Sequence, residues 1–321
     1  MSPRRIARTL RNNPVPTALS ALLLAGLVST ALVTTAFTSS GPGCGYGYGY
    51  GYGYGYGYGY GYGTCPPPPP PPAVSTGYRF VAADGGIFSF DAPFFGSMGG
   101  RHLNAPIVGM AEDPATGGYW FVAADGGIFS FNAPFFGSMG GRHLNAPIVG
   151  MAATPNGMGY WFVAADGGIF SFGNASFLGS MGGKHLNAPI VGMAADPATG
   201  GYWFVASDGG IFSFDAPFHG SMGGKKLNAP IVGMAADPAT GGYWFVAADG
   251  GIFSFDAPFH GSMGGKHLNA PIVGMAADPA TGGGYWFVAA DGGIFSFDAP
   301  FHGSMGAKKL NAPIVGMAAA A

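Results

Sequence analysis

From Gly77 onward, the hydrophobic and polar positions of the chain recur with a period of 41–42 residues. Each period contains three apolar runs, which in one unit read IVGMAA (231–236), YWFVAA (243–248) and IFSF (252–255). The runs are short and rich in aromatic and β-branched residues, and Gly, Pro and Asp separate them. Runs of this kind favour β-strands rather than helices.

The segments between these runs carry strong turn signals. PATGG joins the first run to the second, and ADGG joins the second to the third as a hairpin, because Asp-Gly accepts the positive φ of a tight turn. After the third run, DAPF predicts a turn into a short fourth strand, FHGSM. Four antiparallel strands in about 41 residues are typical of one blade of a β-propeller. The motif DGGIF, which marks each unit, begins at Asp84, Asp125, Asp166, Asp208, Asp249 and Asp291.

The two ends of the repeat region predict a closed ring. The first unit starts at Tyr78 with no PIVGM run before it, and the chain ends with an additional PIVGM run. We expect residues 314–318 to pair beside residues 78–82, which removes the exposed sheet edges of an open array. The predicted fold class is therefore all-β, a six-bladed β-propeller of four-stranded blades over residues 77–321, closed by the C-terminal strand. The first unit has Arg79 where the others have Trp, which marks the seam and predicts a polar contact there.

The chain before the repeats divides into two segments. Residues 1–16 contain four Arg and no acidic residue, and an apolar run follows at residues 17–37. This order is typical of an export signal, either cleaved or retained as a membrane anchor. We therefore predict a signal peptide or N-terminal membrane anchor at residues 1–37, and a low-complexity stalk of Gly-Tyr dipeptides and prolines at residues 38–76. Both features predict an extracellular or cell-surface location.

Cys44 and Cys65, the only two cysteines, flank the Gly-Tyr tract. Outside the cell we expect them to form a disulfide with each other, with pairing between chains and free thiols as the alternatives. A bridge between them closes a loop of about 22 residues, for which loop entropy gives roughly 3 kcal/mol. The tyrosines of the tract also predict self-association.

Composition and charge narrow the functional classes. The chain contains 61 Gly and 27 Pro, which disfavour helical folds. The formal charge is −2, and residues 77–321 carry nine Lys and Arg against fifteen Asp and Glu, so no basic field exists to attract nucleic acid. We expect no nucleic-acid partner, and a membrane contact only through the N-terminal segment.

Near-identical units are poor candidates for catalysis, for a metal site or for a cofactor site. Ser262, His260 and Asp256 are close in sequence, but HGSMG lacks the Gly two residues before Ser that a nucleophile elbow requires. His219, His260 and His302 occupy one repeated position that holds Phe or Leu in the other units, which predicts a partly buried aromatic slot. The Asp residues of ADGG and DPATGG supply too few oxygens for calcium and predict turns.

The loop before each LNAP motif carries a basic pair, and these pairs are the candidate binding residues. In a four-stranded blade this loop and the ADGG hairpin share one face, so the pairs and the ADGG aspartates would form rings on the same face. Two interpretations remain: a solvated ring of weak salt bridges, or a polyvalent patch for anionic wall polymer or carbohydrate. The pairs are Arg101 with His102, Arg142 with His143, Lys184 with His185, Lys225 with Lys226, Lys266 with His267, and Lys308 with Lys309.

Units reading GYWFVAADGGIFSF, then GSMGG and LNAPIVGMAA, resemble a repeat of secreted actinobacterial proteins with propeller-like surface domains. The match covers residues 77–321, and the resemblance implies an extracellular, envelope-associated role without catalytic residues. We expect a non-catalytic binding or adhesion module whose partner is an envelope polymer, a carbohydrate or a surface protein. A self-assembling coat protein is the alternative, and a propeller hydrolase or lyase is the third hypothesis.

Overall fold

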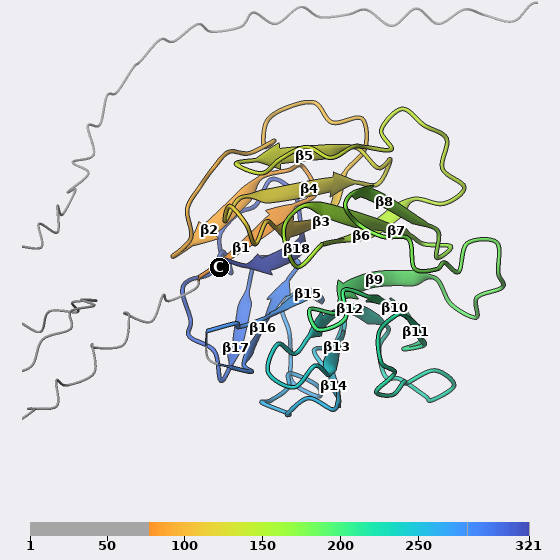
Figure 1. Cartoon of the computed structure of the whole chain (residues 1–321). Coiled ribbons are helices and arrows are strands. Elements are labelled where there is room, and N and C mark those ends of the chain that lie inside the picture. Colours follow the sequence, from red (N-terminus) through yellow and green to blue (C-terminus); the bar gives the residue numbers. More distant parts are fainter. Residues whose placement is uncertain (1–76, 281, 321) are drawn as a thin grey trace, which may run out of the picture. The chain divides into compact units, whose positions relative to one another are not determined.

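The computed structural model describes residues 77–280 and 282–320, which form eighteen β-strands and no helix (Figure 1). The strands make six antiparallel sheets of three strands each, one for every unit of the repeat. The fold is all-β and resembles a β-propeller. The predicted signal or anchor at residues 1–37, the predicted stalk at residues 38–76 and the predicted disulfide between Cys44 and Cys65 lie outside the described residues.

We number the sheets, and the units they represent, from 1 to 6, and call the strands of a sheet inner, middle and outer. From unit 1 to unit 6 the sheets are β18-β1-β2 (Ile314–Ala319, Tyr78–Ala82, Ile87–Phe90), β3-β4-β5 (Ile107–Glu112, Tyr119–Ala123, Ile128–Phe131), β6-β7-β8 (Ile148–Ala153, Gly159–Ala164, Ile169–Gly173), β9-β10-β11 (Ile190–Ala195, Tyr202–Ala206, Ile211–Phe214), β12-β13-β14 (Ile231–Ala236, Tyr243–Ala247, Ile252–Phe255) and β15-β16-β17 (Ile272–Ala277, Tyr285–Ala289, Ile294–Phe297).

The inner strands contact one another in a complete cycle, from β3 through β6, β9, β12 and β15 to β18 and back to β3. Figure 1 shows these strands towards the centre and outer strands such as β14 and β17 at the periphery. The repeated GMAA sequence allows the close approach, because Gly lacks a side chain. A Cβ atom built on each inner-strand glycine would lie 3.5–3.8 Å from the Cα of the next glycine in the cycle. These glycines are Gly109, Gly150, Gly192, Gly233, Gly274 and Gly316.

The last strand of the chain completes the first sheet, as the sequence predicted. β18 pairs antiparallel with β1, and the register places Tyr78 opposite Ala319 and Ala82 opposite Ile314. A register shift near the end of the pair recurs in all six inner-to-middle pairings, so the pairing at the seam repeats that within the other sheets.

The expected fourth strand is not found among the described residues, where every sheet has three strands. We call residues 91–98, and the equivalent segments of the other units, the strap. Each strap bonds to the next sheet instead of to its own outer strand: the N–H of Phe95 donates to the Tyr119 hydroxyl (3.1 Å), and that hydroxyl donates to the carbonyl of Gly96 (2.7 Å). A long-range side chain therefore satisfies the backbone groups that a fourth strand would have used.

The same hydroxyl–carbonyl bond crosses all six junctions, including the one between unit 6 and unit 1. The donor–acceptor pairs are Tyr119 with Gly96, Tyr160 with Gly137, Tyr202 with Gly179, Tyr243 with Gly220, Tyr285 with Gly261, and Tyr78 with Gly303, at 2.6–2.8 Å.

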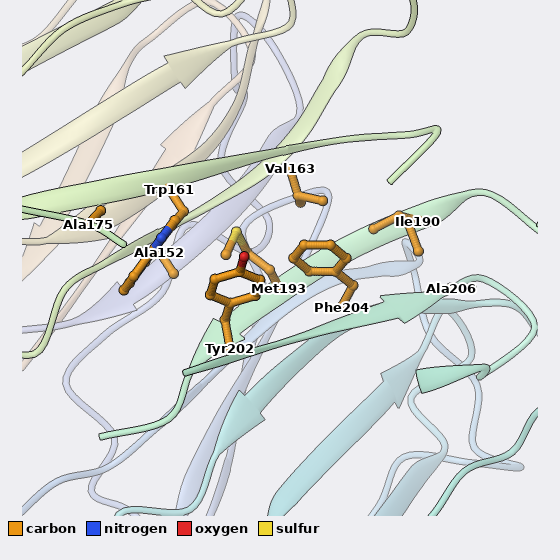
Figure 2. Packing of buried hydrophobic residues seen from close by; sticks show 9 residues of the cluster. All are labelled: Ala152, Trp161, Val163, Ala175, Ile190, Met193, Tyr202, Phe204 and Ala206. Carbon is orange, nitrogen blue, oxygen red and sulfur yellow. The ribbon is translucent and has the colours of Figure 1, made fainter. Parts of the chain in front are cut away.

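The hydrophobic core consists of six layers, one between each pair of consecutive sheets. Figure 2 shows the layer between units 3 and 4, where Trp161 of β7 faces Tyr202 and Phe204 of β10, with Met193 of the inner strand beside them. Every side chain of each middle strand is buried, because both faces of the sheet are covered. This explains why these strands are apolar throughout instead of alternating.

The polar contact predicted for Arg79 is present, but it lies at the junction of units 1 and 2 and not at the seam where β18 pairs with β1. Its Nε donates to the carbonyl of Pro93 (3.0 Å), which matches the bond from the Trp120 indole to the carbonyl of Pro134 (2.8 Å) one unit later. The guanidinium also pairs with Glu112, at a position that holds Ala in the other inner strands, and lies over the Tyr119 ring, 5.1 Å from its centroid. A buried ion pair thus occupies the place of a Trp at the junction of units 1 and 2.

Candidate functional site

The two ends of the sheets carry different turns and therefore different chemistry. The Asp-Gly-Gly hairpins between middle and outer strands lie at one end, and the turns between inner and middle strands lie at the other. The first end also carries the basic pairs, and we call it the basic face. The second carries a proline after each of the inner strands β3, β6, β9, β12 and β15, and we call it the proline face.

Backbone hydrogen bonds hold each basic loop against the hairpin of its own unit. In unit 1 the N–H of Met98 and the hydroxyl of Ser97 both donate to the carbonyl of Gly85 (3.0 Å each), and the N–H of Arg101 donates to the carbonyl of Met98 (2.9 Å). The equivalent bonds from the Met and from the first basic residue are present in all six units. The predicted placement of the basic pairs beside the ADGG hairpins is confirmed.

All twelve residues of the basic pairs are exposed to solvent. The aspartate of each hairpin accepts a hydrogen bond from the second glycine of its own turn, as Asp84 does from Gly86 (2.9 Å), which is the turn role that the sequence predicted. No ion pair among residues 77–280 and 282–320 joins a basic pair to a carboxylate. The described structure thus contains no salt-bridge ring, and the cationic groups point into solvent without a carboxylate partner.

The fold separates the charges of the repeat region. Eight of its nine Lys and Arg residues lie in the basic loops, with the six hairpin aspartates beside them. The other nine carboxylates lie towards the proline face, where Arg79 is the only Lys or Arg. A ligand approaching the two faces therefore meets opposite electrostatic environments, although the summed charge of the region is negative.

A pocket of about 400 Å³ opens on the proline face where the inner strands end. Its lining is almost wholly apolar, and Glu112, which pairs with Arg79, is its only charged residue. This pocket was not predicted from the sequence. The signal for it is the Pro that follows the inner strand in five units, because these prolines converge only once the strands form a ring. They are Pro114, Pro155, Pro197, Pro238 and Pro279.

One phenylalanine of every strap is exposed, which the sequence analysis also missed. The exposed fractions are 62–65%, high for a large apolar side chain that recurs at one position of every unit. The residues are Phe94, Phe135, Phe177, Phe218, Phe259 and Phe301.

His219, His260 and His302 lie in partly buried aromatic slots, as predicted. Their side chains are 15%, 15% and 5% exposed, and each lies between a Trp and a Tyr ring. The contact that sequence reasoning did not find is a carboxylate from the next unit. The Nδ1 atom of each ring lies 2.7 Å from Oδ2 of an aspartate; the pairs are His219 with Asp256, His260 with Asp298, and His302 with Asp91.

The strap serines serve the fold. Ser262 Oγ donates to the carbonyl of Gly250 (3.1 Å), and the five equivalent serines make the same bond within their units. Ser262 thus holds its strap against the hairpin rather than facing His260 as a nucleophile would. No group of three or more His, Cys, Asp or Glu residues with metal-site spacing occurs within the described part of the chain.

The six middle-strand tyrosines are the groups whose ionisation the fold changes. Burial of the phenol raises the pKa of Tyr160 above its ordinary value of 10.0, and the backbone N–H groups of Phe136 and Gly137, which donate to the phenol oxygen, oppose part of that rise. The same balance raises the pKa of the other five. These shifts reflect the interlocking of the units, because each phenol lies under the strap of its neighbour.

Comparisons with known proteins identify no family for this chain. Within residues 77–280 and 282–320, no helix is long and apolar enough to cross a membrane. No family model matches the chain, and no curated protein matches it.

Proposed function

We propose that residues 77–320 form a closed six-bladed β-propeller that acts as a non-catalytic extracellular or cell-surface binding module. Its basic face binds an anionic polymer of the cell envelope or an acidic carbohydrate. The observation that carries this proposal is the set of basic pairs, exposed, without carboxylate partners and repeated in six units on one face.

The repetition suits a repetitive ligand. A single exposed cation contributes under about 1 kcal/mol to an ion pair in water. Several contacts to one polymer chain add up, because after the first contact the others form at a high effective concentration. Binding of this kind weakens as salt screens the charges. The export-type sequence of residues 1–37 and the low-complexity stretch at residues 38–76 support presentation of the module outside the cell.

The test is binding of the full-length protein to polygalacturonate, with neutral dextran as the matched polymer. We expect binding to polygalacturonate alone, at least about tenfold weaker at physiological than at low salt. Replacing the eight basic-face Lys and Arg residues by Gln should abolish it. A control variant with Asn for the strap aspartates Asp91, Asp215, Asp256 and Asp298 changes four charges on the other face and should bind normally. Equal binding of the Gln variant and the native protein would refute the proposal.

The exposed phenylalanines favour a second candidate, a self-assembling coat protein. Exposed apolar side chains at regular intervals provide contacts between copies of the chain, and the Gly-Tyr tract supplies further aromatic groups. Light scattering separates the two sources. A variant with Ser for all six phenylalanines tests the strap contacts, and deletion of residues 45–63 tests the tract. If both variants scatter like the native protein, the coat hypothesis is wrong.

A further inference from the structure

Unit 3 departs from the other units at two places that meet in the structure. Residues 154–159 read TPNGMG where units 2, 4 and 5 read DPATGG. Residues 173–176 read GNAS where those units read DAP or NAP, which is one residue shorter. In a chain of near-identical units, two coordinated departures in one unit call for a physical explanation.

In the common unit a carboxylate braces the turn. Asp113 accepts hydrogen bonds from the N–H of Ala115 (3.0 Å) and the hydroxyl of Thr116 (2.7 Å), and Thr116 lies 2.7 Å from the carbonyl of Asn132 at the start of the strap. The turn and the strap are thus joined through one negatively charged group and one hydroxyl. Asp196 and Thr199 repeat this arrangement in unit 4.

In unit 3 a neutral group takes the place of the carboxylate. The buried hydroxyl of Thr154 lies 2.9 Å from Oδ1 of Asn156, 3.3 Å from Oδ1 of Asn174 and 3.1 Å from the carbonyl of Gly159. The bracing therefore uses the Thr hydroxyl and the two amide oxygens. It leaves the Nδ2 groups of Asn156 and Asn174 without a hydrogen bond to any described residue.

These departures line a surface pocket of about 330 Å³ between units 3 and 4. Thr154, Asn156, Asn174 and Ser176 contribute from unit 3, and the turn at residues 197–200 contributes from unit 4. The indole of Trp161 also lines the pocket, with its N–H bonded to the carbonyl of Ser176 (2.8 Å). None of the lining residues is charged, which is unusual on a face that carries nine carboxylates.

We propose that this pocket binds one uncharged saccharide residue. Primary amides and hydroxyls both donate and accept hydrogen bonds, which matches a ring bearing several hydroxyl groups. The rings of Pro155 and Pro197 offer apolar surface to the C–H groups of the sugar. An ion finds no compensating charge there and would lose its hydration. The volume is at the low end for ligand pockets, which suits one pyranose ring rather than an oligosaccharide.

This site is independent of the proposed function, since it lies on the other face and uses no charge. The two can therefore fail separately. Binding at the unit 3 pocket is expected to be insensitive to salt and to the Gln substitutions of the basic loops.

The experiment is a ligand-observed NMR titration of the full-length protein with methyl mannoside and, separately, N-acetylglucosamine. A ligand of about a dozen non-hydrogen atoms at ordinary efficiency has a Kd of about 1 mM. We expect at least one of the two sugars to bind in that range with a stoichiometry of one.

The chain supplies its own matched variants. Replacing residues 154–159 by DPATGG and residues 173–176 by DAP gives unit 3 the sequence of unit 4, which the same fold already accommodates. This variant should lose sugar binding, and Asn156→Ala, which copies the other units, should weaken it at least about tenfold. Conversely, placing TPNGMG and GNAS at residues 237–242 and 256–258 should give unit 5 a second site and a stoichiometry of two. Failure of both sugars to bind in the low-millimolar range, or undiminished binding by the DPATGG variant, would overturn the proposal.

Discussion

Replacing Tyr78 by Phe tests the junction of units 6 and 1, where β1 meets the last strap of the described chain. The Tyr78 hydroxyl donates to the carbonyl of Gly303 (2.6 Å) and accepts from the N–H groups of His302 (3.1 Å) and Gly303 (2.9 Å). All of these bonds join the first described strand to the last strap. The substitution removes one oxygen atom and leaves the ring packing against Trp286 and Phe90 in place.

The magnitude follows from the groups that lose a partner. A hydrogen bond of this kind contributes about 1 kcal/mol net, and partly buried N–H and C=O groups left unpaired raise the cost. We expect Tyr78→Phe to lower the free energy of unfolding by about 2 kcal/mol. For a region of this size that corresponds to a decrease in Tm of about 4–8 °C.

The assay is urea unfolding of the full-length protein, followed by tryptophan fluorescence, with Tyr243→Phe as the matched control. The Tyr243 hydroxyl makes the same three bonds across the junction of units 4 and 5: it accepts from the N–H groups of His219 and Gly220 (3.0 Å each) and donates to the carbonyl of Gly220 (2.8 Å). If the ring is closed in solution, the two substitutions cost nearly the same free energy of unfolding. If Tyr78→Phe costs less than about 0.3 kcal/mol while Tyr243→Phe costs the full amount, the junction of units 6 and 1 is open and the closure argument fails.

Three further predictions concern the pH dependence of stability, the Arg79–Glu112 ion pair and the inner-strand glycines. Burial raises the pKa of the six middle-strand tyrosines above 10.0, so the folded state holds their protons more tightly than the unfolded state. The contribution of these tyrosines to the free energy of unfolding should therefore be constant below pH 10 and should fall as pH rises through the folded pKa. Urea unfolding at a series of alkaline pH values measures this fall. Glu112→Ala leaves the buried Arg79 charge unpaired and should lower the free energy of unfolding by about 3–5 kcal/mol. Adding Arg79→Trp copies the other junctions and should restore most of that stability. A double variant as unstable as the single one would contradict this reasoning. Gly192→Ala should change stability by less than about 1 kcal/mol, because the new Cβ atom would lie 3.7 Å or more from its neighbours. Gly192→Leu should overpack the space between the inner strands and cost about 1–3 kcal/mol or more. Thermal melts followed by circular dichroism compare the two variants.

Much of the fold was predictable because its determinants are local. Short apolar runs, turn residues and the missing first run predicted the three strands of each unit and the pairing of β18 with β1. The fourth strand was wrongly expected because FHGSM has the composition of a short strand. What overrides that tendency is a phenol about 23 residues further along, which takes the N–H and C=O groups that strand pairing needs. No local pattern reveals such a competitor.

The candidate sites also differ in whether local sequence was enough to predict them. The basic loops could be placed beside the hairpins from strand order alone. The proline-lined pocket could not, because its walls come from all six units and depend on how closely the inner strands approach one another. The pairing of His219 with Asp256 depends on the strap leaning onto the next sheet, which the expected fourth strand would have prevented. The amide groups of unit 3 were visible in the sequence, but their convergence was not.

Because the hydroxyl bond of Tyr78 repeats the bond made at every other junction, the cycle of sheets has no intrinsic beginning. The order of the repeats in the sequence, and not the packing, determines that the missing inner-to-middle turn is the one between β18 and β1. A chain of residues 77–320 with these two ends joined through a short linker, and cut instead within the turn at residues 238–241, should assemble the same six sheets around the same axis. The units are in that sense interchangeable under rotation. Arg79 with Glu112, the altered turn of unit 3 and the three His–Asp pairs distinguish some angular positions from the others.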